Sequence, residues 1–183
     1  MRWIVEEFRL VGKSLFREGL VSGRAGNLSY AWKDRLIITR TGSFLGNLTD
    51  RDLVEVPLKK GSVLDERASV ELPVHRRVIL ETGKRAVVHA HPPCAVSLSL
   101  FEKTIDPVDS EGKVILGEVP VLDPEKPSAS EELARAVAEA LRDHKVVVIK
   151  GHGAFAADMS LMRAYSYIST LEHSCRIRIL SRI

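Results

Sequence analysis

Residues 86–93, with the sequence AVVHAHPP, constrain this chain more than any other stretch. The first three residues form an apolar run that predicts a buried strand. Because successive side chains of a strand point to opposite faces, His89 and His91 project together. Proline cannot donate to a sheet ladder, so the strand ends at Pro92 and leaves both imidazoles at its tip. Such a pair could supply half of a zinc site, although two unrelated surface histidines would give the same pattern.

Size and composition predict one globular domain that spans residues 1–183. Hydrophobic residues make up 45% of the chain and charged residues 28%, and no apolar run approaches the roughly 20 residues of a membrane span. The net charge is only +3, and the arginines are scattered without interleaved aromatic residues. These features argue against a membrane or nucleic-acid partner and leave room for a small anionic ligand.

Cysteine usage predicts a reducing compartment. Only Cys94 and Cys175 could form a disulfide, and the N-terminus lacks the apolar core of a signal peptide. We therefore expect a cytoplasmic protein with free thiols. The chain also has no glutamine and many charges, a composition reported for proteins from hot environments, so we expect a thermophilic source.

Apolar periodicity predicts alternating helices and strands. Helices are expected over residues 2–18, 71–81, 94–100 and 130–142, and from residue 160 onward. Strands are expected at residues 28–32, 36–39, 53–58, 86–88, 114–116, 119–122 and 146–149. Ser128 and Glu131 have capping-box spacing at the start of the fourth helix. Residues 59–61 predict a solvated turn.

Two further residues are candidates for the histidine site. His152 follows the strand at 146–149 and lies between two glycines. Because glycine has no side chain that would shield the imidazole, this position suits a histidine that binds a ligand. Glu71 stands at the start of a predicted helix, where the helix dipole favours a carboxylate. An ordinary first-turn charge would look the same. His75 lies four residues later, and we expect it to form a side-chain pair with Glu71 instead of binding metal.

Two turns are candidates for an anion site. Gly23 and Gly26 allow residues 22–29 to turn tightly and present backbone N–H groups to a ligand. The second turn, at residues 41–43, is small and carries hydroxyl groups. A glycine-rich turn without a ligand is equally compatible with the first segment.

Five short motifs occur in one order along nearly the whole chain. They are Gly26-Asn27-Leu28-Ser29, Thr41-Gly42, Ser69-Val70-Glu71-Leu72-Pro73-Val74-His75, His89-Ala90-His91-Pro92 and Gly151-His152-Gly153. This ordered set resembles the class II aldolase/adducin family, and within it the L-fuculose-1-phosphate aldolases. The resemblance implies a three-layer α/β/α fold around a largely antiparallel sheet, assembled as a cyclic homotetramer.

The resemblance also implies an activity and roles for individual residues. It implies a zinc-dependent aldolase that reversibly cleaves a ketose 1-phosphate, through an enediolate, to dihydroxyacetone phosphate and an aldehyde. The substrate is thus a small phosphorylated sugar. The matching positions are His89, His91 and His152 for Zn²⁺, Glu71 for the catalytic base that can also approach the metal, and Gly26, Asn27, Thr41, Gly42 and Ser69 for the substrate phosphate.

Two departures from the family pattern leave other activities open. Val70 replaces a serine that family aldolases often carry, and residues 120–124 lack the tyrosine that protonates the leaving aldehyde. The chain ends at Ile183, before the tail that brings another tyrosine in the family, so we expect the proton donor to be missing. Methylthioribulose-1-phosphate dehydratases share a similar metal site. Pentulose-5-phosphate 4-epimerases share the zinc but usually carry aspartate in place of Glu71, and an adducin-like interaction module would not need three histidines.

Overall fold

The structure is a computed structural model that describes residues 2–59 and 61–181. The helices are α1 (Arg2–Arg17), α2 (Leu72–Thr82), α3 (Pro93–Ser99), α4 (Ser110–Ile115), α5 (Glu131–Asp143) and α6 (Leu161–Leu180). The strands are β1 (Asn27–Trp32), β2 (Arg35–Thr39), β3 (Leu53–Pro57), β4 (Ala86–Ala90), β5 (Thr104–Ile105), β6 (Val119–Leu122), β7 (Val146–Ile149) and β8 (Gly153–Asp158). Short 3₁₀ turns at Leu45–Asn47, Asp50–Asp52 and Val63–Arg67 connect some of these elements.

The strands form one eight-stranded sheet in the order β3-β2-β1-β4-β8-β7-β6-β5. Among the described strands, β6 and β7 alone pair in parallel, and every other neighbouring pair is antiparallel. The expected α/β fold with a largely antiparallel sheet is therefore confirmed. β4, which carries His89, lies in the interior of the sheet between β1 and β8.

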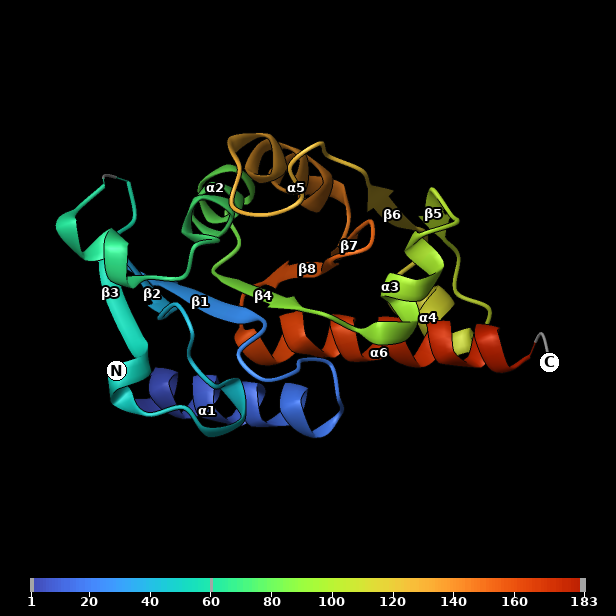
Figure 1. The fold of residues 1–183 in the computed structure, drawn as a ribbon, viewed down its shortest axis with the longest axis horizontal. Coiled ribbons are helices and arrows are strands. Elements are labelled where there is room, and N and C mark those ends of the chain that lie inside the picture. Colours follow the sequence, from blue (N-terminus) through green and yellow to red (C-terminus); the bar gives the residue numbers. More distant parts are fainter. Residues whose placement is uncertain (1, 60, 182–183) are drawn as a thin grey trace.

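Helices cover both faces of this sheet (Figure 1). The apolar sides of α1, α3 and α6 pack on one face, and those of α2 and α5 pack on the other. Strand alternation sends Val88 and Ala90 of β4 into the first core and Val87 into the second. His89 shares the face of Val87, and its ring stacks on Phe155 with ring centroids 4.1 Å apart. The sheet thus lies between two layers of helices.

Residues 114–116, expected to be a strand, belong instead to the end of α4 and its C-cap. The side chain of Asp109 accepts a hydrogen bond from the Gly112 N–H and caps the helix. Asp109 also accepts a hydrogen bond from Ser174 of α6, which holds the segment against that helix. Local capping and packing override the apolar run, because strand preference depends on having a partner strand.

β8 was not expected from the sequence. Three of its six residues are alanine, which has little intrinsic preference for strands, and pairing with β4 on one side and β7 on the other makes it a strand. The expected turn at residues 59–61 includes Lys60, which lies outside the described residues. Within the described chain, no helix combines the length and apolar character needed to cross a membrane.

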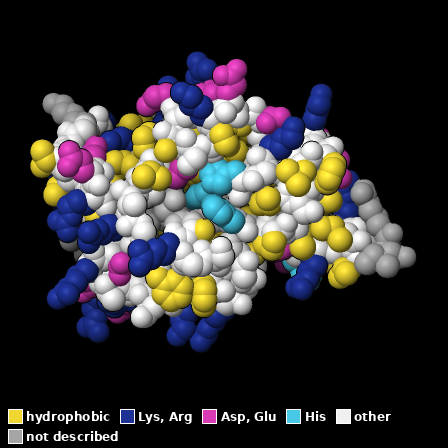
Figure 2. All heavy atoms as spheres, viewed as in Figure 1, with side chains coloured by type: hydrophobic (Ala, Val, Ile, Leu, Met, Phe, Trp, Pro, Cys, Tyr) yellow, Lys and Arg dark blue, Asp and Glu magenta, His cyan; other side chains and the backbone are white. Residues whose placement is uncertain are grey.

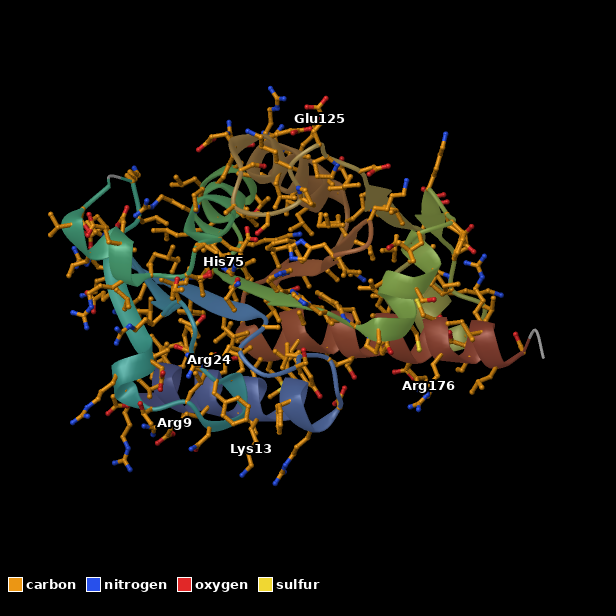
Figure 3. All side chains as sticks on the ribbon, viewed as in Figure 1. Arg9, Lys13, Arg24, His75, Glu125 and Arg176 are labelled. Atoms are coloured by element: carbon orange, nitrogen blue, oxygen red, sulfur yellow. The ribbon has the colours of Figure 1, made fainter. Side chains whose placement is uncertain are left out.

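The side chain of His75 links α2 to β1 through hydrogen bonds (Figure 3). Its fully buried ring places Nδ1 2.7 Å from Ser29 Oγ and Nε2 2.5 Å from Asn27 Oδ1. An amide oxygen can only accept, so Nε2 carries the proton and Nδ1 accepts from the Ser29 hydroxyl. The expected side-chain pair of His75 with Glu71 is therefore wrong. The amide nitrogen of Asn27 remains available for other partners.

Burial lowers the pKa of His75 to about 3, from an ordinary value of 6.5. Between these values the unfolded chain binds a proton that the folded protein does not, so folding stability falls as the pH decreases. We predict that this group alone lowers the free energy of unfolding of the metal-free protein by about 1.4 kcal/mol per pH unit below pH 6. Denaturant titrations between pH 7 and pH 5 should show a shallower dependence on pH in His75→Gln.

The matched control is His173→Gln, which changes an exposed histidine of α6 and should keep the wild-type dependence on pH. An equally steep dependence in His75→Gln and wild type would contradict the prediction, whatever the effect of the substitution on stability at pH 7.

Candidate functional site

The site residues expected from the sequence line one pocket with a volume of about 230 Å³. They are Gly26, Asn27, Thr41, Gly42, Ser69, Glu71, His89, His91 and His152. Four residues not assigned to it from the sequence complete the lining, namely Arg24, Arg40, Val70 and Ser128. In Figure 2, histidine side chains reach the surface near the middle of the face that is shown. A larger cavity of about 600 Å³ beside α6 contains none of the expected residues.

His89, His91 and His152 meet at this pocket. The alternation of side chains along a strand predicts this for the first two. The Nε2 atoms of His89 and His91 are 3.1 Å apart, and one ring nitrogen from each of the three histidines lies within 4.8 Å of the others. Zinc with tetrahedral Zn–N bonds of about 2.0–2.1 Å requires nitrogen atoms about 3.3 Å apart. The cluster therefore has a spacing that suits a metal ion.

The protonation of the cluster also fits a metal. Burial, and next the neighbouring His91 and His152, hold the pKa of His89 well below its usual range, and burial lowers the pKa of His91 to about 4. The Nδ1–H of His89 donates to the Ala154 carbonyl at 3.0 Å, which leaves the Nε2 lone pair free. Among the described residues, the buried Nδ1 of His152 has no hydrogen-bond partner. Neutral imidazoles with free lone pairs are the form that binds a divalent cation.

Gly153 allows the three rings to come together. A Cβ at this position would lie 2.5 Å from the Ala90 carbonyl oxygen, 2.8 Å from His91 Cδ2 and 3.0 Å from His89 Cε1. Any side chain at Gly153 would therefore force β4 and β8 apart or displace the histidines. His152 itself sits in the tight turn between β7 and β8, where its N–H donates to the Ile149 carbonyl.

Glu71 is the buried carboxylate of the pocket, with 3% of the residue exposed. It is the N-cap residue of α2, yet its side chain makes no capping hydrogen bond to that helix. Its oxygens accept instead from Ser128 Oγ at 2.8 Å and from the Ala129 N–H at 3.2 Å. The expected capping role of Ser128 is wrong, because Ser130 is the N-cap of α5.

The two turns expected to bind an anion both border the pocket. Gly26 has a φ of +80°, and a Cβ there would lie 2.9 Å from the His89 carbonyl oxygen. Gly42 has a φ of +76° in a turn closed by the Ser43 N–H on the Arg40 carbonyl. The Thr41 hydroxyl donates to the Ala68 carbonyl at 2.7 Å, so its proton is already used within the protein. The contribution of this turn must therefore come mainly from backbone N–H groups.

Arg24 and Arg40 are the functional candidates that the sequence argument missed. Both are exposed at the pocket, and Arg24 Nη1 lies 3.6 Å from the position of a Cβ built on Gly42. Figure 3 shows Arg24 on the side of the sheet that carries α1, away from His75. The signal that could have found them is simple, since Arg24 lies within the first candidate anion turn and Arg40 directly precedes the second.

Cys94 is not part of the group of three histidines. Burial, and next a hydrogen bond with Glu172, raise the pKa of its thiol to about 11. The thiol therefore stays protonated at neutral pH, whereas metal binding requires the thiolate. The described residues that line the pocket include no tyrosine.

Comparisons with known proteins show the family of the chain. The family described as "Class II Aldolase and Adducin N-terminal domain" matches residues 6–179. The crystal structure of L-fuculose-1-phosphate aldolase from Thermus thermophilus superposes with a TM-score of 0.95 at 45% identity, covering 100% of this chain and 95% of that one. L-fuculose phosphate aldolase of Methanocaldococcus jannaschii is 28% identical over 96% of both chains.

A second kind of relative has a comparable level of identity. The 3-oxo-tetronate 4-phosphate decarboxylase of Escherichia coli K12 is 28% identical, covering 94% of this chain and 84% of its own. The family is thus shared by enzymes with different reaction names. The protein belongs to the class II aldolase and adducin N-terminal domain family, as its ordered motifs indicate, and it resembles the fuculose-phosphate aldolases within that family.

Proposed function

We propose that the protein is a zinc-dependent aldolase that cleaves a ketose 1-phosphate of the fuculose type to dihydroxyacetone phosphate and an aldehyde. An aldolase-type lyase is the class that the comparisons indicate. The observation that carries the proposal is that three clustered histidines, a buried carboxylate and two glycine-containing turns line one pocket of about 230 Å³.

His89, His91 and His152 would hold the metal ion. Their free lone pairs and mutual spacing suit Zn²⁺, and three protein ligands leave a position open for substrate. When bound, the ion supplies Lewis-acid stabilisation of the negative charge that develops on the substrate oxygens, worth several kcal/mol.

Glu71 is the residue placed to move the proton. Its carboxylate lies in the same pocket but outside the group of three histidines, so it can contact substrate without occupying the metal site. We assign it the role of base that removes the carbon-bound proton beside the carbonyl of dihydroxyacetone phosphate. A positioned base of this kind contributes roughly 10² to 10⁴-fold.

Gly26, Asn27, Thr41, Gly42 and Ser69 would hold the phosphate. The hydrogen bond from His75 to Asn27 Oδ1 leaves the Asn27 amide nitrogen as a donor, and Ser69 Oγ, which accepts from the Glu71 N–H, keeps its own proton to donate. Arg24 and Arg40 add positive charge at the same side of the pocket. This charge offsets the hydroxyl contact that is absent because residue 70 is valine.

Because the described pocket residues include no tyrosine, related reactions of sugar phosphates remain alternatives to aldol cleavage. Decarboxylation, dehydration and epimerisation of sugar phosphates use the same activated carbon but need different proton donors. The discriminating assay incubates the zinc-loaded protein with a panel of ketose phosphates and scores cleavage, epimerisation, dehydration and release of carbon dioxide together. A non-catalytic, adducin-like module would show none of them.

We also propose that residues 1–183 act as a single domain that assembles as a homotetramer in the cytoplasm. The family match spans most of the chain, and both helical layers share one sheet. Free Cys94 and Cys175 suit a reducing compartment. The tetramer follows from family resemblance, and light scattering at working concentration tests it.

Removing any one histidine of the cluster should abolish tight metal binding. We predict about one zinc per wild-type chain, retained at pH 6 and lost as the pH falls toward 4, because only then does His91 take up a proton. Metal analysis of His89→Ala, His91→Ala and His152→Ala after dialysis is the measurement. Cys94→Ala and His173→Ala are controls that should keep the metal, and wild-type metal content in all three cluster variants would refute the assignment.

The pocket should distinguish a phosphate ester from its parent alcohol. We predict that dihydroxyacetone phosphate binds at least about 10-fold more tightly than dihydroxyacetone, since backbone N–H groups and arginine prefer an anion. Arg24→Gln should weaken binding of the phosphate about 5-fold, as expected for an exposed charge-assisted contact. Calorimetry measures both, with Arg17→Gln at the other cavity as the control, and equal affinities for the two ligands in wild type would exclude a phosphate site.

Glu71→Gln should abolish proton transfer while leaving the metal in place. We predict that wild type exchanges a carbon-bound proton of dihydroxyacetone phosphate with deuterated water, and that Glu71→Gln loses roughly 10² to 10⁴-fold of this rate. Proton NMR follows the exchange, and metal analysis checks the zinc. Ready proton exchange with weak carbon–carbon cleavage would indicate that the acid that protonates the leaving aldehyde is missing. Undiminished exchange in zinc-replete Glu71→Gln would show that Glu71 is not the base.

A further inference from the structure

The carboxylate of Glu71 is oriented by a loop that is remote in the sequence. Ser128 and Ala129 belong to the segment between β6 and α5, 57 and 58 residues away from Glu71. One donor reaches each carboxylate oxygen, the Ser128 hydroxyl at Oε1 and the Ala129 N–H at Oε2. Both loop residues are exposed, whereas Glu71 is buried beneath them.

The loop is built to present these donors. Ala129 has a φ of +49°, a left-handed conformation that residues other than glycine adopt uncommonly and that clusters at functional sites. Directly after it, Ser130 Oγ donates to the Lys126 carbonyl at 2.8 Å and accepts from the Leu133 N–H at 3.0 Å. Ser130 thus fixes the loop and caps α5, and Ser128 is left with Glu71 as its partner.

Two donors still leave the carboxylate able to accept a proton. A carboxylate offers about four lone-pair sites on its two oxygens, so each oxygen of Glu71 keeps one free. The donors fix where those free sites point. They also hold Glu71 outside the group formed by His89, His91 and His152, although all four residues line one pocket.

We propose that Ser128 is a positioning residue that, together with the Ala129 N–H, holds Glu71 in the orientation needed to remove the substrate proton. The proposal rests on the proposed role of Glu71 as the base. The hydroxyl of Ser128 contacts the carboxylate of Glu71, so we assign it an action through Glu71, on the rate of proton transfer and not on metal or phosphate binding.

The first test compares proton exchange in Ser128→Ala and Ser128→Thr. Groups that orient a catalytic side chain are typically worth about 10- to 100-fold. Ser128→Ala should lose that much of the exchange rate, with KM for dihydroxyacetone phosphate and zinc content unchanged. Ser128→Thr keeps the hydroxyl and should restore most of the rate.

The matched control is Ser166→Ala, which removes an exposed hydroxyl from α6 that contacts the Arg163 carbonyl and does not line the pocket. It should leave kcat for exchange close to wild type. The double variant Glu71→Gln with Ser128→Ala should be no slower than Glu71→Gln alone, because a residue that acts only through Glu71 has nothing left to act on.

A second readout does not depend on activity. Amide hydrogen exchange of Ala129 in the metal-free protein should quicken in Glu71→Ala, which removes the oxygen that accepts from the Ala129 N–H. Unchanged protection of Ala129 would overturn the proposal. A wild-type rate in Ser128→Ala, beside a Glu71→Gln that has lost exchange, would also overturn it while leaving the proposed function intact. No exchange in wild type would instead remove the proposed function.

Discussion

The antiparallel pairing of β1 with β4 is the interaction on which the site depends. It sets Asn27 directly opposite His89, so a residue proposed to bind the phosphate and a residue proposed to bind the metal form one pair of the ladder. Gly26 lies so close to β4 that a Cβ would come within 2.9 Å of the His89 carbonyl. A slip of one residue in this register would turn His89 into the opposite core. The sheet therefore fixes the separation between the metal and phosphate ends of the pocket.

Buried polar groups then make the site rigid. His75 is a neutral bridge between Ser29 and Asn27, and the Ala154 carbonyl fixes the ring of His89. Burial of an unpaired polar group is costly, so these groups are stable only because each has a partner and stays uncharged. Burial also lowers the pKa of His89 and His91, which favours the neutral form that binds a cation. Burial thus contributes both to the packing of these strands and to the chemistry of the two histidines of β4.

Strand periodicity and motif order could predict the metal cluster, because the facts that place it are local. Two residues of β4 separated by one position must share a face, and His152 between glycines must sit in a turn. The partners of Glu71 could not be predicted in this way. Ser128 looked like a helix cap because its spacing to Glu131 fits one, and only the tertiary fold shows that Ser130 takes that place. β8 was missed for a related reason, since its alanines become a strand through pairing with two neighbours.

The pocket of one chain is complete for one half of an aldol cleavage and incomplete for the other. Metal ligands, a buried carboxylate and an anion cradle suffice to take a proton from carbon and stabilise the resulting charge. Releasing an aldehyde also needs an acid, and the described pocket residues include no tyrosine to provide one. In the proposed lyase, a pocket group other than tyrosine or a water molecule would have to give that proton. Arg24 and Val70 are exposed residues of the pocket lining, so water can reach this part of it. The proposed mechanism thus assigns a residue of this chain to the removal of the proton from carbon and assigns none to the protonation of the aldehyde.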